Sequence, residues 1–99
     1  MIATVTEATA MEVCKLQLYV VGTSPRTSTA VTNIRKFCDS YYGEYYRLEV
    51  IDISIQPELA ESANILAAPT LVRSLPLPIR RVVGDMSDTE RVLSALNRW

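Results

Sequence analysis

The sequence predicts one α/β domain in which the elements follow one another in the order βαβαββα. Its length of 99 residues, with 48% hydrophobic and 21% charged residues, suits a single globular core. Short apolar runs mark four strands, and apolar residues spaced three to four positions apart mark three helices. Glycine and proline residues stand between most of these segments, where turns are expected.

The first half of the chain reads as strand, helix and strand. Residues 1–14 lack a clear pattern and are expected to form a flexible lead-in, so the folded domain covers residues 15–99. Residues 15–21 are rich in β-formers on both faces, which predicts a strand that is covered on both sides. The following helix ends at Gly43, and a second strand covers residues 46–53. The helix carries one apolar stripe, which consists of Ala30, Val31, Ile34, Phe37, Cys38 and Tyr41.

The second half opens with a short helix and two strands. Pro57 suits the first turn of this helix, whose inward-facing residues are Leu59, Ala60 and Ala63. Strands are predicted over residues 70–75 and 79–83, because both segments are rich in β-formers. Pro76 and Pro78 interrupt them and predict a turn between the two strands.

The last helix is expected over residues 88–98, after Gly84 and Asp85 close the fourth strand. Ser87 and Glu90 have the spacing of a capping box, in which each side chain binds the backbone N–H of the other residue. One helical face is apolar and consists of Val92, Leu93, Leu96 and Trp99.

The connections between strands predict a thioredoxin-like sheet with helices on both faces. A βαβ unit has a right-handed crossover and parallel strands, whereas the short turn between the last two strands requires an antiparallel pair. In such folds a cis-proline precedes the third strand, and Pro69 occupies this place, so we predict a cis bond between Ala68 and Pro69.

The residue types exclude most enzymatic chemistry. The chain contains no histidine, which removes histidine triads and histidine metal sites. Cys14 and Cys38 lie 24 positions apart and cannot form a C-x-x-C motif, so we interpret both as small core residues. The thioredoxin reactive position falls on residues 23–28, which contain no thiol. We therefore expect no enzyme activity and no cofactor.

Charge and hydropathy narrow the class of partner. A net charge of −1 argues against nucleic-acid binding through a broad basic field, and no apolar run is long enough to span a membrane. The N-terminal residues do not resemble a signal peptide, which favours a cytoplasmic protein. Arg73, Arg80 and Arg81 are interpreted as a solvated sheet edge. Most of the tyrosines between residues 41 and 46 are expected to be half-buried packing residues.

Several stretches of this chain resemble the KaiB family of small circadian clock proteins. The most specific runs from Leu75 to Ser87, with the sequence LPLPIRRVVGDMS. Together the similar stretches span residues 15–96 in order, and the others are Leu18–Gly22 with Pro25, Val50–Ile53, Pro57–Glu61 and Ile65–Leu71.

This resemblance implies a regulatory binding protein rather than an enzyme. KaiB-like proteins bind the ATPase ring of KaiC, capture KaiA and compete with the KaiB-like sensor domain of the kinase SasA. The resemblance places a KaiC-like partner on a surface that includes Glu49, Asp52, Pro57, Glu61 and Asn64.

The resemblance also implies two alternative folds. One is the thioredoxin-like monomer, and the other has its C-terminal half rearranged (βαββααβ) and forms a homodimer or homotetramer. Structural or switch positions in this chain would be Pro69, Pro76, Pro78, Gly84, Asp85, Ser87 and Ala95. Clock-type members carry glycine at position 95, so alanine there favours the helical, thioredoxin-like state.

Two departures from the clock-type pattern leave the partner open. Glu49 and Asn64 stand where clock-type members carry lysines that face KaiC. Reversing a charge at an interface changes partner choice. The alternatives are therefore a divergent KaiB-like protein with a non-clock, stress-response partner, or a sensor domain of a SasA-type histidine kinase.

Overall fold

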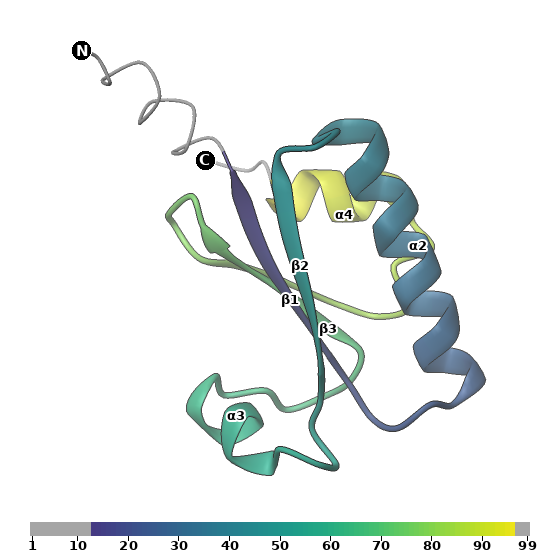
Figure 1. The fold of residues 1–99 in the computed structure, drawn as a ribbon, viewed down its shortest axis with the longest axis vertical. Coiled ribbons are helices and arrows are strands. Elements are labelled where there is room, and N and C mark those ends of the chain that lie inside the picture. Colours follow the sequence, from purple (N-terminus) through teal and green to yellow (C-terminus); the bar gives the residue numbers. More distant parts are fainter. Residues whose placement is uncertain (1–12, 97–99) are drawn as a thin grey trace.

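The computed structural model describes residues 13–96 and contains four strands and three helices in the predicted order (Figure 1). The elements are β1 (Cys14–Val20), α2 (Pro25–Tyr41), β2 (Tyr46–Asp52), α3 (Pro57–Ser62), β3 (Thr70–Leu75), β4 (Arg80–Val83) and α4 (Thr89–Leu96). Of the lead-in predicted for residues 1–14, residues 1–12 lie outside the described residues. Cys14 is the first residue of β1 and so belongs to the folded domain. Trp99 also lies outside them.

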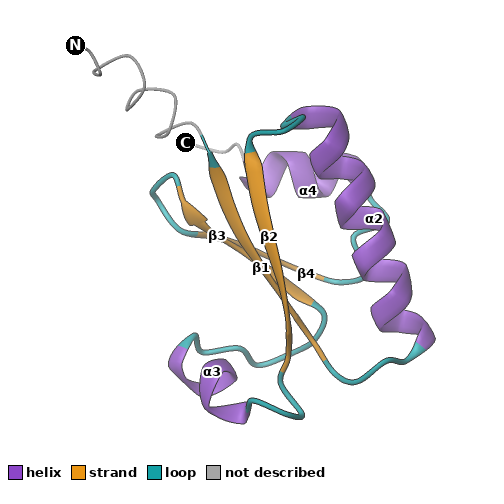
Figure 2. Ribbon diagram, viewed as in Figure 1, coloured by secondary structure: helices purple, strands orange, loops and turns teal. Residues whose placement is uncertain are grey.

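The four strands form one sheet in the order β2-β1-β3-β4 (Figure 2). β1 runs parallel to β2 and antiparallel to β3, and β3 pairs antiparallel with β4. This topology confirms the thioredoxin-like arrangement predicted from the connections. The bond between Ala68 and Pro69 is cis, as predicted, and the bonds preceding Pro76 and Pro78 are also cis.

Helices cover both faces of the sheet, as Figure 1 shows. α2 and α4 pack on one face, where Ile34, Phe37 and Leu96 meet the inward side chains of the strands. α3 lies on the opposite face, where a smaller core joins Leu59 to the sheet residues Tyr19, Ile51 and Val72. The strands alternate between these two cores, which explains why both of their faces are apolar.

Helix α2 begins earlier than its apolar stripe alone suggests. Ser24 is its N-cap, because the Ser24 hydroxyl accepts a hydrogen bond of 3.3 Å from the Thr27 N–H, and Pro25 occupies the first turn. Most of the predicted stripe is buried or packed against the core, but Tyr41 is 49% exposed. Tyr41 stacks against the edge of the core through Phe37, with 4.6 Å between ring centroids.

The predicted capping box at the start of α4 is wrong by one residue. Asp88 accepts a hydrogen bond of 3.1 Å from the Arg91 N–H, which makes Asp88 the N-cap. The Ser87 N–H instead donates to the Asp85 carboxylate at 3.0 Å, so it is not available to Glu90. The helix therefore begins at Thr89, one position later than predicted.

The expectation that Arg73 lies on a solvated edge is also wrong. Arg73 is 3% exposed, on the face that α2 and α4 cover. Its guanidinium donates to the carbonyl of Leu96 at the end of α4 and, at 2.6 Å, to the carbonyl of Pro78 in the β3–β4 turn. A helix C-terminus presents unpaired carbonyls and attracts positive charge, which explains this burial.

Candidate partner-binding surface

The partner-binding residues inferred from the resemblance gather on the α3 side of the sheet. Glu49 lies in the edge strand β2, two residues before Ile51, and therefore on the sheet face that carries α3. Pro57 and Glu61 are exposed residues of α3, and Asn64 follows the helix and is exposed as well. The structure thus brings these four side chains to one side of the molecule.

Asp52 differs from the other four because its carboxylate is already engaged. It accepts hydrogen bonds from the Gly22 N–H at 3.0 Å, the Ser54 N–H at 3.0 Å and the Ser54 hydroxyl at 2.6 Å. These bonds, above all the one from the Ser54 hydroxyl, lower the pKa of Asp52. Asp52 ties the ends of β1 and β2 together and so positions the turn that leads into α3.

Arg81 holds the other end of α3, a role that the sequence did not predict. From strand β4 its guanidinium donates to the carbonyl of Ala63 at 2.5 Å and to the carbonyl of Asn64 at 3.2 Å. Asn64 has a left-handed backbone, with φ of 57°, which ends the helix. The position of Asn64 therefore depends on a contact made across the sheet face.

Two exposed apolar side chains flank α3 in the chain. Ile55 precedes the helix and is 75% exposed, and Leu66 follows it and is 97% exposed. Protein interfaces combine apolar residues with a polar rim. We call the set Glu49, Ile55, Pro57, Glu61, Asn64 and Leu66 the α3 surface.

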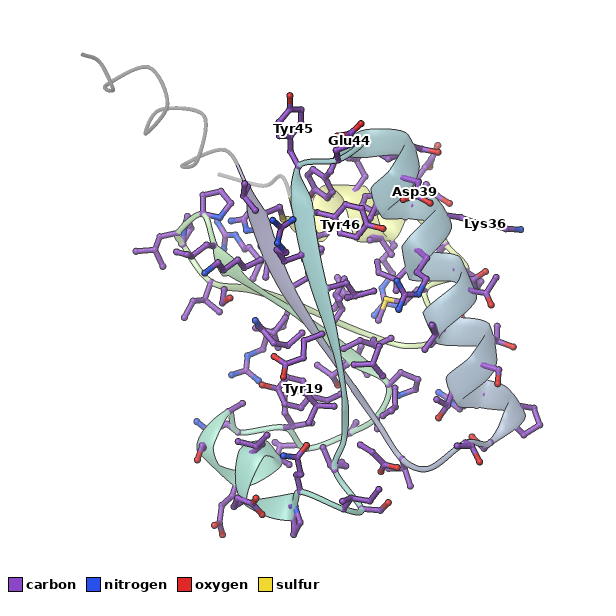
Figure 3. All side chains as sticks on the ribbon, in the orientation of Figure 1. Tyr19, Lys36, Asp39, Glu44, Tyr45 and Tyr46 are labelled. Carbon is purple, nitrogen blue, oxygen red and sulfur yellow. The ribbon has the colours of Figure 1, made fainter. Side chains whose placement is uncertain are left out.

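On the same sheet face Tyr19 lies between the sheet and α3 (Figure 3). Burial, with the nearby charge of Glu49 as a second cause, raises the pKa of Tyr19, so its hydroxyl stays protonated near neutral pH. The base of the α3 surface is therefore an apolar ring with a neutral hydroxyl group.

The thioredoxin reactive position holds no redox group. Ser24, Thr27 and Pro69 line a small hollow of about 40 Å³ there, and none of its lining residues is a cysteine. Cys14 and Cys38 are free and buried in the larger core, which confirms their interpretation as core residues. Burial raises the pKa of the Cys38 thiol to about 12, so it remains a thiol at neutral pH.

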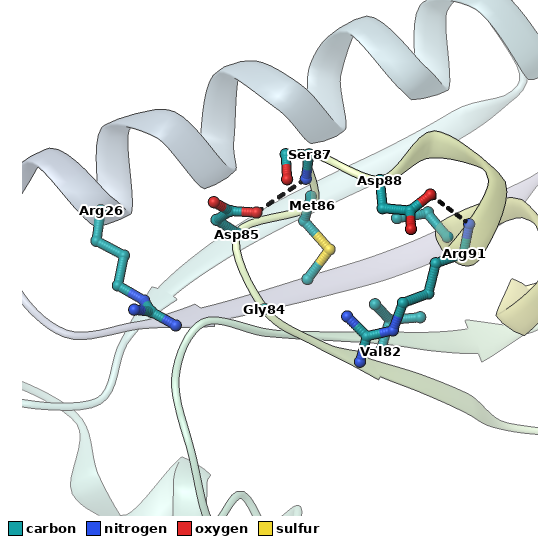
Figure 4. A pocket seen from close by; sticks show the side chains of 9 residues that line it. Arg26, Val82, Gly84, Asp85, Met86, Ser87, Asp88 and Arg91 are labelled. Carbon is teal, nitrogen blue, oxygen red and sulfur yellow. Dashed lines mark hydrogen bonds between the residues drawn. The ribbon is translucent and has the colours of Figure 1, made fainter.

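The residues proposed for fold switching do not form one site. Gly84, Asp85 and Ser87 lie together at a pocket of about 240 Å³ that Arg26 and Arg91 flank (Figure 4). The hydrogen bonds from the side chain and backbone of Ser87 lower the pKa of Asp85. The Gly84 N–H donates to the carbonyl of the buried Pro69 at 2.9 Å, which links this pocket to the start of β3.

The backbone conformation of Gly84 favours glycine. Its φ of +131° is a conformation that other residues rarely adopt, whereas the Arg91 guanidinium, 3.2 Å from where a Cβ atom would lie, is the end of a flexible side chain. Pro76 and Pro78 lie elsewhere, in the β3–β4 turn, and Ala95 lies in α4 against the larger core.

Within residues 13–96, no cluster of acidic, cysteine or histidine side chains has the grouping of a metal site. No helix in this described part of the chain is long and apolar enough to cross a membrane.

Sequence comparison gives matches over most of the chain. A family model described as KaiB domain matches residues 17–99. The circadian clock protein KaiB3 of Synechocystis is 44% identical over 82 residues, which are 83% of this chain and 80% of that protein. The circadian clock oscillator protein KaiB of a Synechococcus strain is 46% identical over 82 residues, which are 83% of this chain and 74% of that protein.

Solved structures with the same fold include clock and redox proteins. The N-terminal domain of SasA from Synechococcus elongatus has a TM-score of 0.72 and 22% identity, covering 89% of this chain and 87% of that domain. Mitochondrial thioredoxin 3 from Saccharomyces cerevisiae has a TM-score of 0.69 and 11% identity, covering 98% of this chain and 89% of that protein. At these identities the similarity concerns the fold alone.

Proposed function

Because the chain belongs to the KaiB family, we propose that it is a non-enzymatic regulatory protein that binds a KaiC-like ATPase ring. Binding would modulate the phosphorylation state of the ring and its output signalling. The observation that supports this most is 44% identity over 82 residues to a circadian clock protein KaiB3. The cysteine-free thioredoxin position supports binding rather than redox catalysis.

We place the interface on the α3 surface, with Asp52 as the residue that positions it. Glu49, Pro57 and Glu61 are exposed, and both ends of α3 are fixed by long-range hydrogen bonds. A surface that is ordered before binding loses less conformational entropy when the complex forms. Ile55 and Leu66 supply apolar area at this surface.

The test is a binding measurement with a KaiC-like ATPase, with and without ATP. We expect the double variant Glu49→Lys and Asn64→Lys to bind a clock-type KaiC about fivefold more tightly, because new ion pairs contribute about 1 kcal/mol. The control is Ser40→Lys with Glu44→Lys, which changes the net charge equally at exposed positions outside the α3 surface. Equal gains in both double variants would indicate a general charge effect and contradict this placement.

A second candidate is a KaiB-like protein with a non-clock, stress-response partner. Glu49 favours it, because this exposed carboxylate reverses the charge that clock-type members present to KaiC. In that case the unmodified chain fails to bind a clock-type KaiC and the lysine variant gains binding. A sensor-domain role of the SasA type rests on the shared fold alone.

Further partners and the cellular setting follow from the same proposal. A bound KaiB-like protein would capture KaiA and displace SasA from the ring, and the thioredoxin-like monomer would be the binding state. Two free, buried thiols suit the reducing cytosol, where we place the protein.

A further inference from the structure

The pocket of about 240 Å³ beside Gly84 is built from three elements that lie far apart in the sequence. Arg26 comes from the first turn of α2, Gly84 directly follows β4, and Arg91 belongs to α4. Val82 and Val92 also line the pocket and are buried, so the groups that a ligand would meet are polar. We call this hollow the β4–α4 pocket.

Two guanidinium groups stand at this pocket with their donors available. Both arginine side chains are exposed, and within residues 13–96 neither Arg26 nor Arg91 donates a side-chain hydrogen bond or forms an ion pair. The Arg91 guanidinium lies beside Gly84, 3.2 Å from where a Cβ atom would stand. Figure 4 shows the two arginine side chains extending on either side of Gly84.

The two carboxylates of the pocket are already engaged with the backbone. Asp85 accepts from the Ser87 N–H at 3.0 Å, and Asp88 accepts from the Arg91 N–H at 3.1 Å, as the dashed lines in Figure 4 show. The hydrogen bonds from Ser87 are the main cause of the lowered pKa of Asp85, and the charge of Arg26 is a minor one. The carboxylates therefore hold the turn, and the donors left for a ligand are those of the two arginines.

We propose that the β4–α4 pocket binds a phosphoryl group, as free phosphate or as part of a small phosphate ester. A guanidinium binds an anion through paired, charge-assisted hydrogen bonds. A carboxylate has two oxygens, which one guanidinium satisfies, whereas a phosphoryl group has three terminal oxygens and can be shared between two. Two arginines from different helices at one pocket therefore favour a phosphoryl group.

The size and the place of the pocket limit what binds there. Its volume of about 240 Å³ is below the roughly 300–1,000 Å³ that is typical of sites for drug-sized ligands, so the ligand is small. α2 and α4 pack on the sheet face opposite α3 (Figure 1). The β4–α4 pocket is thus separate from the α3 surface, and this inference does not depend on the proposed function.

The test is an NMR titration of the full chain, labelled with ¹⁵N, near neutral pH and at constant ionic strength. Inorganic phosphate and glycerol 3-phosphate are the two probes. We expect saturable shifts of the backbone amides of residues 84–88 and of the Nε–H groups of Arg26 and Arg91. Tighter binding of glycerol 3-phosphate would support the proposal and identify an ester as the source of the phosphoryl group, and equal or weaker binding would support it with free phosphate as the ligand. Sodium acetate, the carboxylate probe, should give no saturable shift.

Four variants assign the binding to named groups. Arg26→Gln and Arg91→Gln should each weaken phosphate binding at least about fivefold, because each removes charge-assisted hydrogen bonds. Arg35→Gln is the matched control, since Arg35 is an exposed arginine of α2 that does not line the pocket, and it should change the affinity less than about twofold. Asp88→Asn keeps a side chain suited to the N-cap but removes a negative charge at the pocket, so it should tighten binding about threefold.

All four variants change exposed side chains, and unchanged amide shifts away from each substitution establish that the fold is kept. The absence of a saturable shift in the unmodified chain would overturn the proposal. So would saturable shifts confined to residues outside the pocket, or acetate binding as tight as that of phosphate. Equal weakening in Arg35→Gln and in the two pocket variants would show a general charge effect and would overturn it as well.

Discussion

Asp52 and Asp85 each fix a turn by accepting hydrogen bonds from the backbone. Asp52 joins the ends of β1 and β2, and Asp85 sets the chain path that leads into α4. The binding and switch roles proposed for these residues therefore act through the backbone they hold. In contrast, Glu49 and Glu61 are exposed, so they remain available to a partner.

Cys38 makes the stability of the protein sensitive to alkaline pH. Burial, followed by the nearby Cys14, raises the pKa of its thiol to about 12, whereas a free cysteine titrates near 8.5. The folded state favours the neutral thiol, so this contribution is fully present below about pH 8.5 and is lost as the pH rises toward 12. We expect the free energy of unfolding in urea to fall between pH 8.5 and pH 11.

The matched variant is Cys38→Ala, which removes the titrating group and should flatten part of this decline. The rest should persist, because burial raises the pKa of Tyr42 in the same direction. An equally steep decline in both proteins would contradict the assignment to Cys38.

At the scale of single elements, α4 begins where two capping residues stand side by side. Ser87 and Asp88 both have side chains suited to an N-cap, but the Asp88 carboxylate is the one that accepts from the Arg91 N–H, while the Ser87 N–H donates to Asp85. We expect Asp88→Ala to lower the free energy of unfolding by about 1 kcal/mol and Ser87→Ala to lower it by less than about 0.5 kcal/mol. Urea denaturation distinguishes the two, and the opposite order would restore the Ser87–Glu90 capping box.

The C-terminal end of α4 depends on Arg73. Arg73→Ala would leave the buried carbonyl of Leu96 and the partly buried carbonyl of Pro78 without their donor and open a cavity. We expect a loss of about 3 kcal/mol in the free energy of unfolding. Arg81→Ala serves as the comparison, because Arg81 also binds two carbonyls but is exposed, so water can replace it at a cost of about 1 kcal/mol. Equal losses would show that burial of Arg73 contributes nothing.

The strands and helices were predictable because the patterns that mark them lie within short stretches of sequence. Strand β3 has the predicted bounds, and the order of strands and helices follows from periodicity and turn residues. Arg73 and Arg81 were not predictable, because their carbonyl partners lie far along the chain or across a sheet face. The gathering of Glu49 and Asn64 on one side likewise depends on how α3 packs, which no local pattern specifies.

At the scale of the whole molecule, α4 biases the choice between the two folds expected in this family. The described chain is in the thioredoxin-like state, in which α4 packs on the larger core through Val92 and Leu96. Ala95 lies inside α4 and contacts this core, at a position where glycine would weaken the helix by about 1 kcal/mol. A change of this size shifts a two-state population about fivefold. We therefore expect the unmodified chain to be a thioredoxin-like monomer and Ala95→Gly to increase the fraction of the rearranged tetramer.

Light scattering after size exclusion gives the oligomeric state, and NMR chemical shifts of residues 87–96 report whether α4 is helical. Lys36→Gly is the control, since it weakens α2 at an exposed position in the half of the chain that both folds share. We expect this control to lower stability without changing the oligomeric state, because it weakens both folds equally. A tetramer with extended shifts in the unmodified chain would contradict the bias. So would an Ala95→Gly variant that remains entirely monomeric and helical under conditions in which a clock-type KaiB forms tetramers.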